Sequence, residues 1–217
     1  MSPIELISRV IEPAMTDTGD RWYRGDCSVF EERTVSSFPR RKLDLMLEAA
    51  HRANLHPTRS ALVGTVQGDH HHGGVLMFSL GLELAGWRAI ELGVDLPVSE
   101  YQKAVACLKP DAIGLSFVLS RNINKRFQEL AQIRDIPIFV GGRSILNYQG
   151  LARKHHLIPL CRPLADSVID FQREVEEWRE TNGQGKNMRY SINGAVVRGW
   201  QRAIRNDNAL AVCEDVV

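Results

Sequence analysis

The residues whose types and spacing could do chemistry lie in one short segment, Gly-Asp-His-His-His-Gly-Gly at positions 68–74. Three successive histidines suggest a metal site, but adjacent side chains in a loop diverge, so all three can hardly bind one ion. The spacing of Asp69 and His71 is more informative. An Asp69 carboxylate that accepts from one ring nitrogen of His71 fixes the tautomer and makes the other nitrogen a better metal ligand. A polar loop whose glycines merely turn the chain explains this segment equally well by itself.

Four further positions favour a binding site over a simple loop. Gly74 has no Cβ, so a bulky group can lie close to its backbone. Ser116 and the pair Gly141-Gly142 each end an apolar segment that is predicted to be a strand. The carboxyl ends of parallel strands meet at one edge of a sheet, where ligands bind in open α/β folds. We therefore expect these residues to form a slot beside His71 that is wide enough for a flat aromatic group.

The elements that must position these residues follow from five alternations of short apolar and helix-length amphipathic segments. This pattern indicates an α/β domain at residues 57–180 with a five-stranded, parallel, doubly wound sheet. The predicted strand order is that of the flavodoxin-like fold, which is Rossmann-like. The strands are expected at 60–67, 87–92, 111–116, 137–142 and 157–161, and the helices at 75–85, 99–108, 124–133, 145–154 and 166–179.

Residues 1–56 are predicted to form a partial helical bundle. Apolar residues recur at helical spacing before Pro13, which is expected near the end of a short first helix. A capping box of Ser28 and Glu31 predicts the start of a second helix, which is expected to kink or break at Pro39. Two such helices cannot bury their apolar faces alone, so they must pack on another part of the chain.

Composition narrows the classes of function. The 217 residues include 27 basic and 26 acidic side chains, so no global field would draw the chain to nucleic acid or anionic lipid. Residues 181–217 are predicted to be a basic C-terminal tail, and such a charge run is more often solvated than bound to DNA.

The first residues are no signal peptide and no apolar run approaches 18 residues. Four scattered cysteines without a CxxC pair favour reduced thiols in a cytoplasmic protein.

The positions singled out above together resemble the cobalamin-binding domain of methionine synthase, corrinoid methyl carriers, base-off mutases and CarH-type light-sensing regulators. They are Asp69-x-His71-x-x-Gly74, Ser116 and Gly141-Gly142. The segment 82–116 is also similar to that family throughout, and the resemblance covers about residues 4–180. It implies a domain that holds adenosyl-, methyl- or hydroxocobalamin.

In detail, the resemblance implies that His71 is the lower axial ligand of the cobalt in a base-off cobalamin. The displaced nucleotide tail would lie in the slot past Gly74, Ser116 and Gly141-Gly142. The family usually has Ser-x-Leu where this chain has Ser116-Phe117-Val118. Because Val118 keeps an apolar wall, the resemblance still implies that the tail binds there.

The helical region separates the subfamilies. CarH-type regulators cover the upper face of the corrin with a helical cap that carries a tryptophan and, ten residues later, a Glu-His pair. Here Trp22 is followed at that distance by Glu32-Arg33. The resemblance implies that Trp22 covers the upper ligand and that Glu32 approaches the same face, although a core residue of a small bundle is the commoner role for such a tryptophan. Arg33 cannot bind cobalt because it stays protonated, so a bis-histidine state would need another donor, for instance His51.

Three functions are compatible with a domain of this kind. The first is a cobalamin-binding, light-responsive regulator of transcription, similar to the AerR antirepressors, that acts through a protein partner such as a transcription factor. Only half of the usual four-helix cap is expected, so either the upper face is more open than in the family, or a partner or a second copy completes the cap. DNA contact is expected only through the tail, and no membrane contact is expected. The alternative is a corrinoid protein that carries methyl groups for a methyltransferase system, which leaves an enzymatic role open. A heme-binding relative would leave the Asp69, Ser116 and glycine positions without a purpose.

Overall fold

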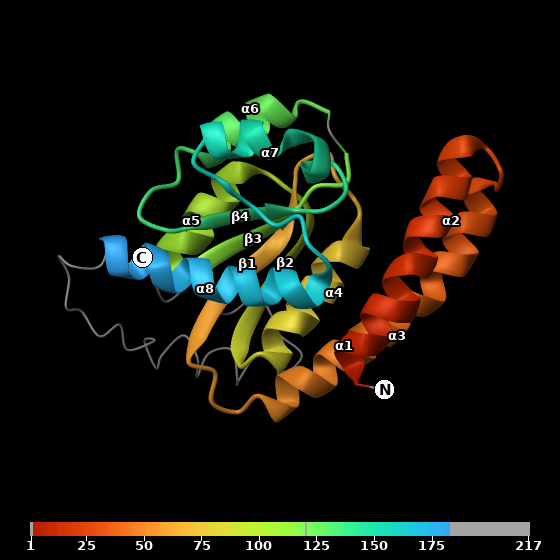
Figure 1. Cartoon of the computed structure of the whole chain (residues 1–217), viewed down its shortest axis with the longest axis horizontal. Helices are drawn as coiled ribbons and strands as arrows, with labels where there is room; N and C mark the ends of the chain where they lie inside the picture. The colour runs from red at the N-terminus through yellow and green to blue at the C-terminus, as the bar shows by residue number, and fades with distance from the viewer. Residues whose placement is uncertain (1, 120, 183–217) are drawn as a thin grey trace.

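The computed structural model describes residues 2–119 and 121–182. Its centre is a five-stranded parallel sheet with the strand order β2-β1-β3-β4-β5, shown in Figure 1. The strands are β1 (Arg59–Val66), β2 (Trp87–Leu96), β3 (Ala112–Ser116), β4 (Ile138–Gly141) and β5 (Ile158–Pro159). The predicted flavodoxin-like strand order is therefore confirmed.

Helices cover both faces of the sheet, as the alternating pattern predicts. They are α4 (His72–Leu84), α5 (Val98–Leu108), α6 (Ile123–Leu130), α7 (Ile145–Lys154) and α8 (Leu164–Asn182). On one face, α5, α6 and α7 pack on a core that includes Leu62 and Phe127. On the other, α4 and α8 pack on a core that includes Val63 and Phe171. Neighbouring residues of β1 thus enter opposite cores, which is why this strand reads as a continuous apolar run.

Strand β2 is longer than the predicted segment 87–92. It continues to Leu96 because its pairing with β1 shifts register twice, so that Gly64 pairs with Gly93 and Val66 with Leu96. Gly93 and Asp95 have positive φ angles, which are typical of turns and bulges. Turn-forming residues inside a strand concealed its true end in the sequence.

The first helical segment does not end near Pro13. Helix α1 (Pro3–Leu6), the π-helical turn η1 (Ile7–Ile11) and α2 (Glu12–Arg24) follow one another directly. Pro13 lies in the first turn of α2. The π-helical turn η1 lies directly before Pro13, and the helical segment continues past this residue, so the prediction of an early end was wrong.

Helix α3 (Val29–Ala53) begins at the predicted capping box. Ser28 Oγ accepts from the backbone N–H of Glu31, and the Glu31 carboxylate accepts from the backbone N–H of Ser28 at 2.8 Å. The predicted break at Pro39 is wrong, because α3 runs through this residue. The carbonyl that loses its donor belongs to Val35, which is exposed, so water can satisfy it.

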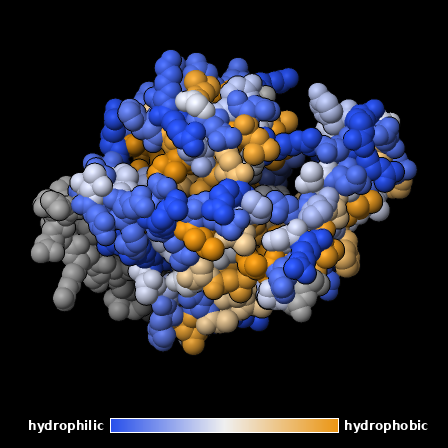
Figure 2. Space-filling view, viewed as in Figure 1, coloured by the Kyte–Doolittle hydropathy of each residue, from blue (hydrophilic) through white to orange (hydrophobic). Residues whose placement is uncertain are grey.

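Helices α2 and α3 form an antiparallel pair, here called the hairpin, whose turn contains Gly25 with a φ of 81°. The base of the hairpin packs on α4 and α8 through a third core, and Figure 2 shows apolar surface along this junction. That core contains Ile7, Ile11, Leu43, Leu76, Leu80, Leu164 and Val168. The base of the helices therefore buries its apolar side chains on the α/β domain, while Trp22, Phe30 and Phe38 further along the hairpin stay exposed. The division at residue 56 stays a prediction. The predicted tail lies almost wholly outside the described residues.

Candidate cofactor site

The loop between β1 and α4 presents one nitrogen of His71 for ligand binding. His71 Nδ1 lies 2.7 Å from Asp69 Oδ1, and the backbone N–H of His71 donates to the same oxygen at 3.1 Å. A carboxylate only accepts, so Nδ1 carries the proton and the lone pair is on Nε2. The His71 side chain is 44% exposed while that of Asp69 is buried. Asp69 thus orients a half-exposed imidazole with a free Nε2, as a metal ligand requires.

Asp69 also joins this loop to the one that follows β3. Its second oxygen, Oδ2, accepts from the backbone N–H groups of Val118 at 2.7 Å and Leu119 at 3.1 Å. Burial alone would raise the pKa of Asp69, but the hydrogen bonds from His71, Leu119 and Val118 outweigh it and lower the pKa. The carboxylate therefore stays ionised as an acceptor of four hydrogen bonds.

Two residues that the sequence reasoning missed hold the backbone of the loop. The Thr65 hydroxyl donates to the carbonyl of Asp69 and accepts from the backbone N–H of Asp95 at 2.9 Å. The Asp95 carboxylate accepts from the backbone N–H of Gly68 at 2.7 Å. Asp95 lies at the carboxyl end of β2, where site residues are expected. A strand predicted to reach Leu96 would have pointed to Asp95 as a site residue.

The other two loop histidines point elsewhere. His72 Nε2 lies 2.5 Å from Glu91 Oε1, and His70 Nδ1 is 3.9 Å from Asp95 Oδ2 with its side chain mostly exposed. The hydrogen bond to Glu91 raises the pKa of His72, on which the charges of Asp44 and Arg40 also act. Across residues 2–119 and 121–182, no group of three His, Cys, Asp or Glu side chains could hold a metal ion. The expectation that the three histidines diverge is therefore met.

Three of the four slot positions lie together at the carboxyl edge of the sheet. A Cβ on Gly74 would lie 2.6 Å from Ser116 Oγ, so the lack of a side chain lets these residues approach. Ser116 pairs with Gly141 across β3 and β4. A Cβ on Gly141 would meet Leu160 only at ordinary contact distance, 3.5 Å. The backbone thus brings a hydroxyl and two glycines together next to the His71 loop.

Gly142 and Val118 contribute through their backbones. Gly142 has a φ of 93°, and a Cβ there would lie 2.7 Å from the Phe117 carbonyl oxygen. Gly142 is therefore required by the fold itself, whatever binds nearby. Val118 donates its N–H to Asp69 and accepts from the Ser144 hydroxyl at 2.7 Å through its carbonyl. Valine in place of leucine leaves both of these hydrogen bonds available.

Helix α2 reaches the site through two contacts that the sequence did not suggest. The side chain of Met15 lies against Gly73, and Asp20 forms an ion pair with Arg143, the residue after Gly142. Trp22 follows Met15 by seven residues, so it lies on the same face of α2 about 10 Å further along the axis. It is 46% exposed, which argues against the alternative of a core residue.

The remaining cap residues are placed as follows. The Glu32 carboxylate accepts from the Ser36 hydroxyl at 2.7 Å and lies 3.6 Å from Arg33 Nε, within its own helix. His51 lies at the other end of α3, 3.1 Å from Glu83 near the end of α4. Because His71 precedes the start of α4, His51 is at the wrong end of that helix to share a ligand with it.

The fold and the site define a doubly wound α/β domain that presents an oriented histidine at the ligand-binding edge of its sheet. Residues 59–155 match the family model described as the B12 binding domain, and this segment contains the His71 loop and the slot. Residues 59–155 therefore form a domain of the cobalamin-binding (B12-binding) family.

Two curated relatives are similar to this chain in sequence. The chain is 31% identical over 188 residues to the HTH-type transcriptional repressor CarH of Myxococcus xanthus, covering 84% of this chain and 58% of that protein. It is 37% identical over 167 residues to the HTH-type transcriptional repressor CarA of the same organism, covering 73% and 53%. The chain thus spans a little over half the length of these relatives.

A solved structure supports the fold. The monomethylamine corrinoid protein of Methanosarcina barkeri is similar with a TM-score of 0.60 and 16% sequence identity, over 80% of this chain and 84% of that one. None of the helices in residues 2–119 and 121–182 is long and apolar enough to cross a membrane.

Proposed function

We propose that this chain is a cobalamin-binding, light-responsive sensor that regulates transcription through a protein partner. The observation that carries the proposal is the His71 imidazole, whose Nε2 is left free by the Asp69 hydrogen bond beside the slot. The similarity to two transcriptional repressors supports the regulatory role over a catalytic one.

In this proposal each site residue has a defined task. His71 would hold the cobalt of cobalamin through Nε2, and the hydrogen bond from Asp69 would keep the ring in the required tautomer. Gly74, Ser116 and Gly141 receive the nucleotide tail, while the backbones of Gly142 and Val118 shape the walls. The cofactor, as adenosyl-, methyl- or hydroxocobalamin, would supply a cobalt centre whose bond to an alkyl ligand is cleaved by visible light.

The hairpin would form the cap over the upper face. The Asp20–Arg143 ion pair and the Met15–Gly73 contact join α2 to the loops of the site, which supports a cap whose Trp22-bearing face is on that side. Trp22 would exclude water from the upper ligand by stacking, and Glu32 would approach from α3.

The setting of the protein is proposed on the same basis. The partner would be a transcription factor, and self-association into a homo-oligomer would accompany or replace it. A cytoplasmic location fits Cys27, Cys107 and Cys161, which are free thiols in the structure. A DNA contact through residues 181–217 concerns a segment beyond the described residues.

The second candidate is a corrinoid protein that carries methyl groups between methyltransferases. The observation in its favour is the likeness of the fold to a corrinoid protein. The half-exposed Trp22 on the site-facing side of α2 and the two transcriptional relatives weigh against it.

An absorption spectrum with a sizing column tests the proposal. The purified chain is reconstituted in the dark with adenosyl-, methyl- and hydroxocobalamin, then measured before and after green light. We expect a light-driven change in both spectrum and apparent size, and in the Trp22→Ala variant a changed light response with nearly unchanged affinity. Tight binding without a light-linked change in size would favour the methyl carrier, and no binding would refute both.

The slot has a separate test in two adjacent glycines. Gly141→Ala adds a methyl at ordinary contact distance, so we expect stability near wild type and cobalamin affinity lower by about 10-fold if the tail lies there. Gly142→Ala forces a side chain into a positive φ and should cost about 1–3 kcal/mol of stability. A larger residue at position 142 therefore tests the stability of the fold and not ligand binding. Unchanged cobalamin affinity in Gly141→Ala would contradict a nucleotide tail bound in the slot. Titration and denaturant unfolding provide the two measurements.

A further inference from the structure

Helix α3 carries a row of exposed apolar side chains, here called the α3 stripe. Its members Phe30, Phe38 and Leu45 are 74%, 67% and 55% exposed. Steps of eight and seven residues place all three on one face of the helix, over a length of about 22 Å. Large apolar side chains that gather on one exposed face mark an interaction surface, whereas singly scattered ones need no explanation.

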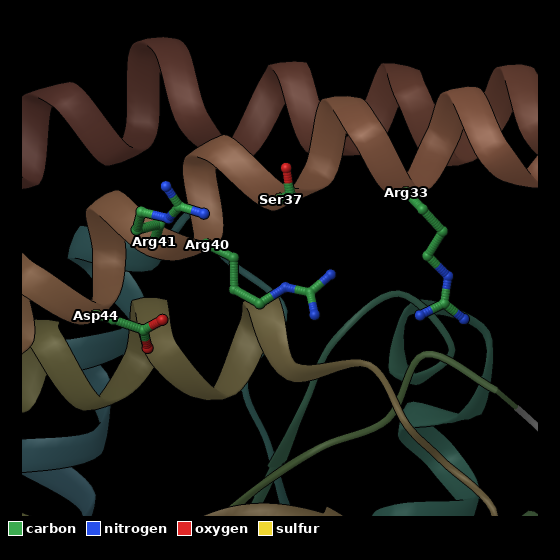
Figure 3. Close-up of a pocket in the computed structure, with 5 residues that line it drawn as sticks. All are labelled: Arg33, Ser37, Arg40, Arg41 and Asp44. Carbon is green, nitrogen blue, oxygen red and sulfur yellow. The ribbon is translucent and has the colours of Figure 1, made fainter.

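The α3 stripe lies on neither of the faces that α3 turns toward the rest of the chain. Ser36 and Leu43 are buried, and each precedes a stripe residue by two positions, which places it on nearly the opposite side of the helix. Figure 3 shows Arg33 and Arg40 extending from α3 toward the loops of the α/β domain, on a third side. The stripe is therefore open to a partner and is separate from the face that α3 turns toward the cofactor site.

The spacing of the stripe is self-complementary. Phe30 and Leu45 are equally far from the point between Ser37 and Phe38. If a second α3 lies antiparallel to the first about a two-fold axis at this point, Phe30 of each copy packs across Leu45 of the other. Phe38, next to the axis, then meets Phe38 of the second copy. One surface thus provides both halves of the contact, as a two-fold interface requires.

The charges beside the stripe favour the same orientation. Glu31 and Lys42 are exposed and flank the stripe near its two ends. Antiparallel packing about this axis brings Glu31 of one copy within about 3 Å, along the helix axis, of Lys42 of the other. Parallel packing would instead place like charges together. Lys42 Nζ lies 5.9 Å from the centre of the Phe38 ring, so this cation borders the apolar surface.

We propose that the α3 stripe binds a second copy of this chain, with α3 antiparallel to α3, in a two-fold dimer that forms without cobalamin and without light. One helix face from each copy makes an interface at the small end of the known range, so we expect a Kd of about 1–100 µM. The proposal does not rest on the proposed function, because no stripe residue belongs to the cofactor site.

Sedimentation equilibrium of the full, cobalamin-free chain tests the dimer at concentrations on both sides of this range. We expect a reversible monomer–dimer equilibrium. Phe38→Glu and Phe38→Lys each place two like charges beside the axis, so each variant alone should have a Kd raised by about 100-fold or more. An equal mixture of the two variants should associate more tightly than either alone, because opposite charges then meet at the axis.

A matched control uses an exposed apolar residue outside the stripe. Ile169 is 60% exposed on α8, close to the value for Phe38. Ile169→Glu should therefore dimerise like the wild type. Because Phe38 and Ile169 are both exposed, neither change should affect folding, which denaturant unfolding of each variant checks.

A wild-type chain that stays monomeric at all concentrations would overturn the proposal and assign the stripe to a different protein. A dimer that persists in both Phe38 variants would also overturn it, as would variants that do not associate when mixed. Loss of the dimer in Phe38→Glu with cobalamin affinity at the wild-type value is the expected result. A chain that dimerises through the stripe but binds no cobalamin would refute the proposed function alone.

Discussion

Replacing His71 with alanine is expected to lower the affinity for cobalamin by about 100-fold or more and to change its absorption spectrum. Loss of a residue that only orients a metal ligand costs about 10- to 100-fold, so loss of the ligand itself should reach at least the upper end. The fold should not suffer, because the His71 side chain is 44% exposed. Titration of the apoprotein with hydroxocobalamin, followed by absorbance, measures both effects.

The neighbouring histidine provides the control. His70 precedes His71 directly, has a mostly exposed side chain and makes only a 3.9 Å contact with Asp95. His70→Ala should therefore bind cobalamin like the wild type. Equal affinities of His71→Ala and the wild type would disprove the axial-ligand role, and an equal loss in both variants would point to a general effect on the loop.

Replacing Glu83 with alanine is expected to reduce the free energy of unfolding by about 3–5 kcal/mol, as when one partner of a buried ion pair is removed. The Glu83 side chain is fully buried where α3, α4 and β2 meet. It lies 3.1 Å from His51 Nδ1 and accepts from Asn54 Nδ2 at 2.8 Å and the backbone N–H of Ala89 at 3.0 Å. Arg88 Nη1 lies 3.5 Å from the same carboxylate.

Denaturant unfolding of Glu83→Ala and Glu48→Ala side by side checks this expectation. Glu48 also forms an ion pair, with Arg52, but both side chains are exposed and such pairs contribute about 0–1 kcal/mol. A loss below about 1 kcal/mol in Glu83→Ala would show that the buried carboxylate does not hold the base of the hairpin to the domain.

Periodicity was sufficient to predict the α/β domain. Five buried strands alternating with amphipathic helices permit few arrangements, and helix α7 has the bounds that its sequence predicted. The errors fall where a turn-forming residue lies inside a regular element. Pro13 and Pro39 were expected to end or bend helices, and Gly93 conceals the continuation of β2. In each case neighbouring hydrogen bonds and packing outweigh a local preference.

The candidate site was predictable in its side chains but not in its backbone. Asp69 and His71 interact as their spacing suggests, because a separation of two residues in a loop lets the Asp69 carboxylate reach the His71 ring. Val118 and Leu119 donate their backbone N–H groups to Asp69, which lies about 50 residues earlier in the chain. No local sequence pattern predicts these hydrogen bonds. At position 118 the sequence suggests a role for the side chain, whereas in the structure Val118 forms its hydrogen bonds through its backbone N–H and carbonyl.

The continuity of α3 through Pro39 has a mechanical consequence. A single helix of 25 residues is a rod about 37 Å long, with the Glu83 contacts at its end. In a rod without a joint, a tilt of about 5° at the fixed end displaces the far end by about 3 Å, since displacement grows with length. An unbroken α3 would therefore carry a small tilt at its packed end, where Met46, Leu47 and Ala50 join the third core, to the turn of the hairpin as a larger displacement.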